Sequence, residues 1–270
     1  MAEVLLFIQH GWQNIWKQKT IWLFSALPVI GQLVLPDYDR REQNLVLLCL
    51  YLMVSILTIV VSVVSFIGVP YLAYCFSIGK SATIQETLLA IRKFAGRIIG
   101  CSVLAVLLLL PCFFLVLAIA FKDADHPLPV SNIAILVFLP LSIFGCLWNF
   151  SIFGFFENDW GIRKSIEHAW SLFTAHFGAL ALLGVLIVVI LRISSAMAGA
   201  VAVLIQSGFD VTSLSNLNFV DPSTTLGKNV LFGLIDGVNQ TIYNTFSTSV
   251  FVLAYLKYSG VKIPAISKPG

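Results

Sequence analysis

Apolar and polar positions follow one pattern in three stretches of this chain, spaced 79 residues apart. In each stretch, residues at i, i+3, i+4 and i+7 are mostly apolar or small, which is the spacing of one face of an α-helix. Long apolar segments follow each stretch, so the pattern predicts three units, each an amphipathic helix followed by a membrane hairpin. The three sets are Ile8, Gly11, Trp12 and Ile15; Thr87, Ala90, Ile91 and Phe94; and Ile166, Ala169, Trp170 and Phe173.

The apolar segments are long enough to cross a bilayer, which takes roughly 20 mostly apolar residues. Segment 20–35 is short and contains Pro28, so it is either a full span or a re-entrant element. Segment 45–79 exceeds the bilayer thickness, so we expect it to tilt, protrude or kink, with Gly68 and Pro70 marking the break. Two spans per unit would make all units run the same way, which favours six. The other segments are 97–121, 131–156, 177–206 and 229–257, the last being unusually polar.

These patterns predict an all-α polytopic membrane protein with about six transmembrane helices and interfacial amphipathic helices. We expect one integral membrane domain, 1–270, with repeat units at about 1–79, 80–158 and 159–260. The composition agrees, because 59% of residues are hydrophobic and only 11% are charged, against about a quarter charged in soluble domains. Lys17 and Lys19 follow the first amphipathic stretch instead of preceding an apolar run, so we expect the N-terminus to be retained.

The placement of basic residues predicts the orientation. Eleven Lys and Arg residues lie on the side of the amphipathic stretches and four lie in the opposite loops, 36–44, 122–130 and 207–228. Because basic residues favour the cytoplasmic side, we expect both termini in the cytoplasm.

The amphipathic helices carry a basic face, which is typical of helices that lie among lipid headgroups. We expect contacts with the lipid bilayer, anionic lipid in particular. Two interpretations stand: the helices orient the hairpins, which we favour, or they sense lipid specifically. The candidate headgroup contacts are Lys17, Lys19, Arg92, Lys93, Arg97, Arg163 and Lys164.

Polar residues inside the last two spans form a candidate intramembrane site, since such groups are costly in lipid and rarely face it. In one interpretation Arg192 pairs with Asp236, or bonds to a polar neighbour, and fixes helix packing. In the other, the polar residues line a solute cavity, with Arg192 binding an anion or Asp236 titrating. The candidate residues are Arg192, Asp236, Asn239, Gln240, Tyr243 and Asn244.

Motifs for catalysis, cofactors, metals and nucleic acid are missing from the sequence. It has no GxSxG, HExxH, P-loop or GxGxxG pattern, and no basic run with interleaved aromatics. The five cysteines lack metal-ligand spacing and are expected to be free thiols. Glu157 and Asp159 could form a carboxylate pair, but Arg163 and Lys164 favour a charged entry to the third amphipathic helix. We therefore expect no catalytic residues, no cofactor, no metal and no nucleic-acid partner.

Trp12, Trp16 and the run KTIWLFSAL from Lys19 to Leu27 resemble uncharacterised bacterial multipass membrane proteins. The repeated helix-plus-hairpin layout is similar to the membrane domain attached to some glycerophosphodiester phosphodiesterases. In those enzymes a separate soluble barrel carries the chemistry, and no catalytic residue carries over to this chain.

We expect a non-enzymatic protein of a bacterial cytoplasmic (inner) membrane, a scaffold or accessory that organises lipid or a membrane protein partner. The alternative is a small-solute transporter or channel that uses the polar last helix and Arg192.

Overall fold

The computed structural model describes residues 2–34, 45–120, 130–206 and 230–261, and these residues are almost entirely helical. This confirms the expected all-α class for the described part of the chain. Three helices are long and apolar enough to cross a membrane, over Leu48–Ser77, Ile84–Pro111 and Phe177–Val201. The described helices are α1 (Ala2–Lys17), α2 (Lys19–Val34), α3 (Leu45–Ser77), α4 (Ile84–Ala120), α5 (Val130–Asn158), α6 (Ile162–Ala175), α7 (Phe177–Gln206) and α9 (Val230–Tyr258).

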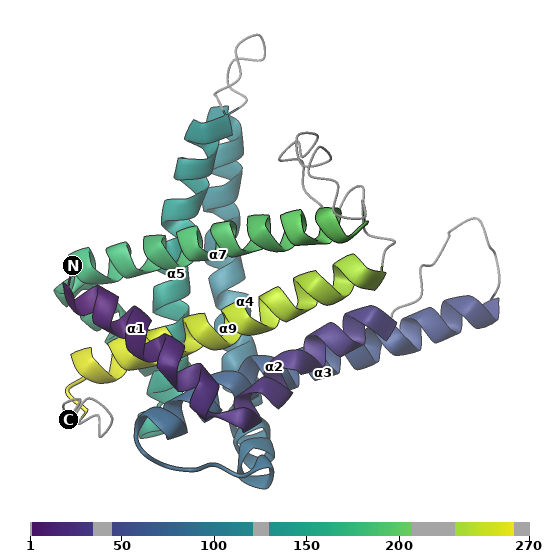
Figure 1. Cartoon of the computed structure of the whole chain (residues 1–270). Helices are drawn as coiled ribbons and strands as arrows, with labels where there is room; N and C mark the ends of the chain where they lie inside the picture. Colours follow the sequence, from purple (N-terminus) through teal and green to yellow (C-terminus); the bar gives the residue numbers. More distant parts are fainter. Residues whose placement is uncertain (1, 35–44, 121–129, 207–229, 262–270) are drawn as a thin grey trace.

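The long helices pack in pairs, α2 with α3, α4 with α5 and α7 with α9. Figure 1 shows that α4 and α5 run together at a steep angle to α7 and α9. The amphipathic helix α1 packs against the last part of α9, where Gly11 meets Val250, and the amphipathic helix α6 packs against α5 and α4. We call this part the basal end: α1, α6, the first turns of α4, and the turns at 78–83 and 159–161.

Helix α9 is the centre of the packing, because it contacts α1, α2, α3, α5 and α7. Its last third is buried on every side, which is the pattern of a core helix and not of a surface one. The buried residues there run without interruption from Val250 to Leu256.

Two glycines allow the first two helices to approach α9 closely. A Cβ atom on Gly11 of α1 would lie 2.4 Å from Cγ2 of Val250, and one on Gly237 of α9 would lie 2.2 Å from Cγ1 of Val29. Since Cβ atoms do not approach other carbons so closely, any larger residue would push α1 or α2 away from α9.

Helix α4 runs without interruption from Ile84 to Ala120, so the second amphipathic stretch and the span expected from 97 form one helix. Its start is fixed by a capping box: Thr83 N donates to Glu86 Oε2 at 2.7 Å, and Glu86 N donates to Thr83 Oγ1 at 3.2 Å. In contrast, the first and third stretches are separate helices, which end before Gln18 and His176.

Helix α3 is continuous from Leu45 to Ser77, so Gly68 and Pro70 do not interrupt it. Both residues are buried, and a Cβ on Gly68 would lie 2.7 Å from Cδ1 of Phe24. We attribute the continuity to this tight packing against α2. Segment 20–35 falls largely on α2, which is a single helix without a reversal in its described residues; its 16 residues rise about 24 Å.

Candidate functional site

The polar residues of α9 face three different surroundings. On the first face, Gln240 Nε2 donates to Asp236 Oδ2 at 2.7 Å, and both side chains are exposed. Asn239 Nδ2 donates to Ser195 Oγ at 3.4 Å, which joins α9 to α7. Arg192 lies exposed on α7. The cavities described below are lined by other residues than Arg192, Asp236 and Gln240.

The second face of α9 is bonded to α2 inside the protein. Ser25 Oγ donates to the carbonyl oxygen of Thr241 at 3.0 Å and accepts from Thr245 Oγ1 at 2.8 Å. All three side chains are buried. Ser25 was not predicted as a site residue, since a lone serine in an apolar run has no distinguishing pattern.

The third face of α9 borders a polar cavity of about 320 Å³, which we call the polar cavity. It lies between α2, α3, α5 and α9. Asn244 is the one member of the predicted intramembrane set that lines it. The polar side chains that line it are Ser62 and Ser65 of α3, Asn149 of α5, and Asn244, Ser247 and Thr248 of α9.

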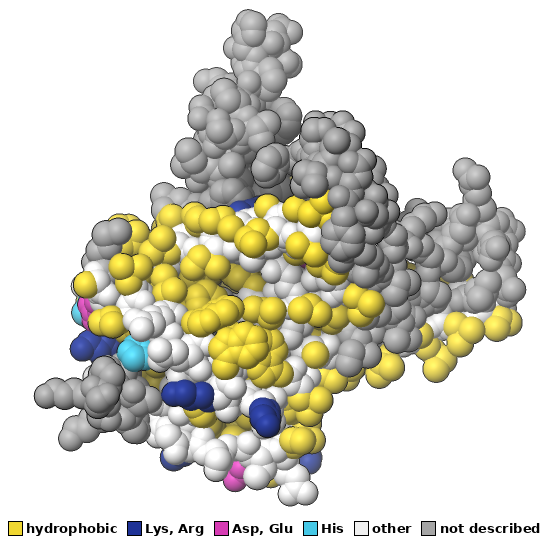
Figure 2. Space-filling model, viewed as in Figure 1, with side chains coloured by type: hydrophobic (Ala, Val, Ile, Leu, Met, Phe, Trp, Pro, Cys, Tyr) yellow, Lys and Arg dark blue, Asp and Glu magenta, His cyan; other side chains and the backbone are white. Residues whose placement is uncertain are grey.

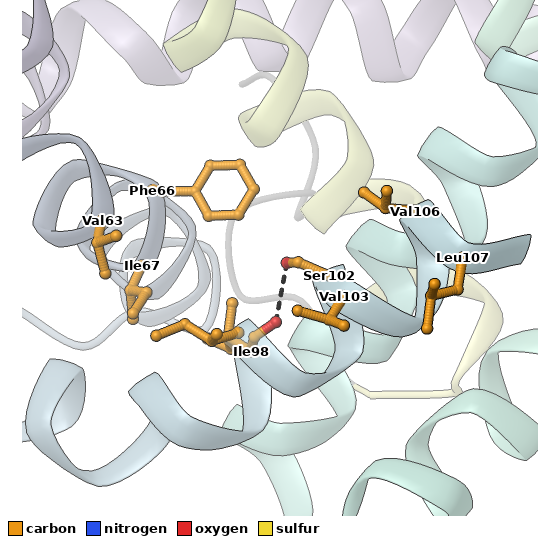
Figure 3. A pocket seen from close by; sticks show the side chains of 9 residues that line it. Val63, Phe66, Ile67, Ile98, Ser102, Val103, Val106 and Leu107 are labelled. Carbon is orange, nitrogen blue, oxygen red and sulfur yellow. Dashed lines mark hydrogen bonds between the residues drawn. The ribbon is translucent and has the colours of Figure 1, made fainter. Parts of the chain in front are cut away.

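Two apolar grooves lie on other sides of the molecule. One, of about 600 Å³, lies between α1, α7 and α9 and is lined by Trp12, Met197 and Val238 among others. The predicted residues Asn239 and Tyr243 also line this groove. The other groove, of about 350 Å³, lies between α3 and α4, and Ser102 is its one polar lining residue (Figure 3).

At the basal end, Asp159 joins the turn after α5 to α4. Lys93 Nζ lies 2.9 Å from Asp159 Oδ2, and Arg97 lies 2.5 Å from Oδ1. Arg97 also donates to the backbone oxygens of Asp159 and Trp160, each at 3.1 Å. The hydrogen bonds from Lys93 and Arg97 lower the pKa of the Asp159 carboxyl below its ordinary value. The partners of Asp159 therefore come from α4 and not from the neighbouring Arg163 and Lys164.

Glu157 is bound by a side chain that the sequence did not indicate. The hydroxyl of Tyr255, a fully buried residue of α9, donates to Glu157 Oε2 at 2.5 Å. The Tyr255 ring makes edge or tilted contacts with Phe150, Phe153 and His168. Burial lowers the pKa of the His168 imidazole, and the negative charge of Glu157 acts in the opposite direction. Glu157 and Asp159 thus serve separate contacts, and the geometry gives no carboxylate pair.

The seven predicted headgroup contacts divide into three ion-paired residues, three unpaired residues, and Lys164, which lies over an aromatic ring. Lys93 and Arg97 pair with Asp159, and Arg163 pairs with Glu167 at 2.8 Å. Lys17, Lys19 and Arg92 are exposed and form no ion pair within the described residues. Lys164 Nζ lies 4.8 Å from the centre of the Trp160 ring.

Large apolar side chains are exposed beside these cations. Trp12, Trp16 and Trp170 are 47%, 58% and 55% exposed. Figure 2 shows Lys and Arg side chains gathered below a broad apolar surface. Exposed tryptophan next to basic residues is typical of a membrane–water interface.

Within the described residues, no group of three or more His, Cys, Asp or Glu side chains is placed to hold a metal ion. Cys75, Cys101 and Cys146 are buried free thiols, and Cys49 is an exposed one. Comparison of the chain with protein-family models, with curated proteins and with solved structures found no match.

Proposed function

We propose that this chain is a non-enzymatic, multi-pass protein of a bacterial cytoplasmic membrane that organises anionic lipid at its basal end. The observation that carries the proposal is a set of exposed cations beside exposed tryptophans. Lys17 lies on α1 with Trp12 and Trp16, Lys19 begins α2, and Arg92 lies on the amphipathic part of α4. A helix with a basic face and an aromatic face binds the headgroup zone through both charge and apolar burial.

In this proposal six helices cross the membrane in three repeated units. The three candidate spans lie in α3, α4 and α7, and the units are completed by α2, α5 and α9. Among the described residues, the basal end carries Lys17, Lys80, Arg92, Lys93, Arg97, Arg163 and Lys164, which favours its position in the cytoplasm.

The ion-paired and unpaired cations have different roles in the proposal. Lys93 and Arg97, held by Asp159, fasten α4 to the turn before α6. Lys17, Lys19 and Arg92 contact lipid phosphates, each with about 1 kcal/mol of attraction. The apolar groove between α1, α7 and α9, of about 600 Å³, accommodates acyl chains of the same lipids.

The test is lipid enrichment around the purified protein. The protein is reconstituted in nanodiscs of mixed phosphatidylglycerol and phosphatidylcholine, and the lipids that copurify are quantified by mass spectrometry. We expect Lys17→Gln, Lys19→Gln and Arg92→Gln together to lower the enrichment of phosphatidylglycerol, by about fivefold for each 1 kcal/mol lost. The matched control removes three cations from the opposite loops, Arg40→Gln, Arg41→Gln and Lys122→Gln. Equal enrichment in both triple variants would contradict the proposal.

A second candidate function, a small-solute transporter or channel, is supported by the polar cavity. Asn244 of α9 lines this cavity, whereas Arg192 does not. In proteoliposomes, transport through the cavity predicts that Asn244→Leu lowers solute flux and that Arg192→Ala leaves it unchanged. Loss of flux in the Arg192 variant alone would instead favour the interpretation in which Arg192 binds an anion during transport.

A further inference from the structure

We infer that the polar cavity is a binding site for a small uncharged polyol. The inference does not depend on lipid binding at the basal end, because it uses different residues and a different ligand, but it rests on the proposed membrane arrangement for the depth of the cavity. It rests on the depth of the cavity, on its hydrogen-bonding groups and on the absence of charge in its lining.

The cavity lies between the helices and is open on one side, where its lining residues Asn244 and Phe66 are exposed. Asn149 is nine residues before the end of α5 at Asn158, a distance of about 14 Å along the helix. Asn244 is fourteen residues before the end of α9 at Tyr258, or about 21 Å. With the basal end at the membrane surface, both residues lie near the middle of a hydrocarbon layer of about 30 Å. Polar groups at this depth need partners other than lipid.

Several polar groups of the lining have no partner within the protein. The side chains of Ser62, Ser65 and Thr248 form no hydrogen bond with another described residue, although Ser65 and Thr248 are buried. Asn149 Nδ2 donates to the carbonyl oxygen of Gly145 at 2.7 Å, which leaves its Oδ1 atom as an acceptor for the cavity. The hydroxyl oxygens of Ser62, Ser65 and Thr248 are open to the cavity and not sealed inside the protein, so an occupant can bond to them. The cavity is therefore built for an occupant that both donates and accepts hydrogen bonds.

The lining also indicates the chemical class of the occupant. None of the described residues that border the cavity is Lys, Arg, His, Asp or Glu, so a charged ligand would lose its hydration there without gaining a counter-charge. Hydroxyl and amide groups can each donate and accept, which matches the hydroxyl groups of a polyol. The volume of about 320 Å³ is at the small end of the range for ligand pockets, about 300–1,000 Å³.

One wall of the cavity is apolar and aromatic. The rings of Phe66 and Trp148 lie 4.4 Å apart between centroids, and both border the cavity together with Pro28 and Pro70. Such a wall suits the C–H surface of a polyol. Phe66 also lines the groove between α3 and α4 (Figure 3), and Trp148 Nε1 donates to Ser102 Oγ, a residue of that groove, at 3.2 Å. The ring pair therefore separates the polar cavity from the groove.

Thiol labelling of the full-length protein in vesicles tests the inference. In a background without the five native cysteines, Ser247→Cys places a thiol in the cavity. Ile242→Cys, five residues earlier, places one in the apolar groove between α1, α7 and α9 and is the matched control. We expect a small uncharged, hydroxyl-bearing methanethiosulfonate reagent to label the first thiol and not the second. Saturating glycerol or sorbitol should then abolish most of the labelling at Ser247→Cys.

A second variant shows whether the protection arises inside the cavity. Thr248→Val has nearly the same shape as the native residue and removes one cavity hydroxyl, so we expect it to weaken protection while the protein keeps its size-exclusion profile. Labelling that neither polyol slows would mean a cavity filled only with water, and this would overturn the inference. Protection by sodium or potassium chloride instead of a polyol, or no labelling of Ser247→Cys at all, would also overturn it.

Discussion

The substitution Tyr255→Phe tests whether the contact between α9 and the end of α5 stabilises the basal end. The hydroxyl of Tyr255 donates to Glu157 Oε2 at 2.5 Å, and the residue is fully buried. Phenylalanine keeps the ring contacts with Phe150 and Phe153, which lie 5.6 and 5.5 Å away between centroids. The substitution thus removes the hydrogen bond and leaves the apolar packing in place.

The expected effect follows from the type of hydrogen bond that is lost. A hydrogen bond to a charged group contributes about 1.5–3 kcal/mol. Glu157 is only half-buried, so water can replace part of the interaction, and we expect a loss near the lower value, about 1.5 kcal/mol. This corresponds to a fall in Tm of about 3–6 °C for a chain of this size.

Thermal unfolding of the purified protein in one detergent measures this change. The matched control is Tyr243→Phe, because Tyr243 is half-buried on the same helix and its hydroxyl forms no hydrogen bond within the described part of the chain. We expect the control to change Tm little. Equal Tm values for the two variants would refute the argument that the bond to Glu157 stabilises the fold.

Three further predictions concern other parts of the molecule. Gly11→Ala should destabilise the protein by about 1–3 kcal/mol through its clash with Val250. The control Gly96→Ala should not, because no atom lies within 4 Å of its Cβ. Denaturation in detergent compares the two variants. Ser25→Ala should cost about 1 kcal/mol in the same assay, and an unchanged midpoint would contradict its role between α2 and α9. Because the pKa of the His168 imidazole is lowered in the fold, its protonation favours unfolding. The free energy of unfolding should therefore fall as the pH drops below 6.5, the ordinary pKa of histidine. Thermal melts of His168→Phe should lack this pH dependence.

The sequence was sufficient to predict the helical class and the amphipathic stretches, because both depend on local periodicity. The 79-residue spacing located α1 and α6 and the first turns of α4. It did not predict that α4 continues from Ile84 to Ala120. The continuity depends on the capping box at Thr83 and on packing, and neither follows from the spacing of apolar residues. For the same reason, Pro70 was expected to break a helix that packing against α2 keeps intact.

The candidate site was predictable only in part. The sequence shows that the last helix is polar. It does not show which of its polar residues face the exposed surface, the contact with α2 or the polar cavity. Asn244 faces the polar cavity and Tyr243 faces an apolar groove, although they are adjacent in sequence. Asn149 was not predicted, because a single asparagine on a distant helix gains its role only when α5 packs beside α9. The same holds for Tyr255, whose hydroxyl has a partner 98 residues away.

The central claim is that the chain crosses the membrane six times with its basal end in the cytoplasm. The most direct measurement is the labelling of single cysteines by a membrane-impermeant maleimide in intact cells and in inverted vesicles. With the native cysteines replaced, the account predicts that Lys17→Cys, Lys80→Cys and Lys164→Cys are labelled only in inverted vesicles. Cysteines at Asp39, Asp125 and Asp221, one in each opposite loop, should be labelled in intact cells. Labelling of Lys80→Cys or Lys164→Cys from outside, or protection of any of the three loops, would contradict the six-span arrangement.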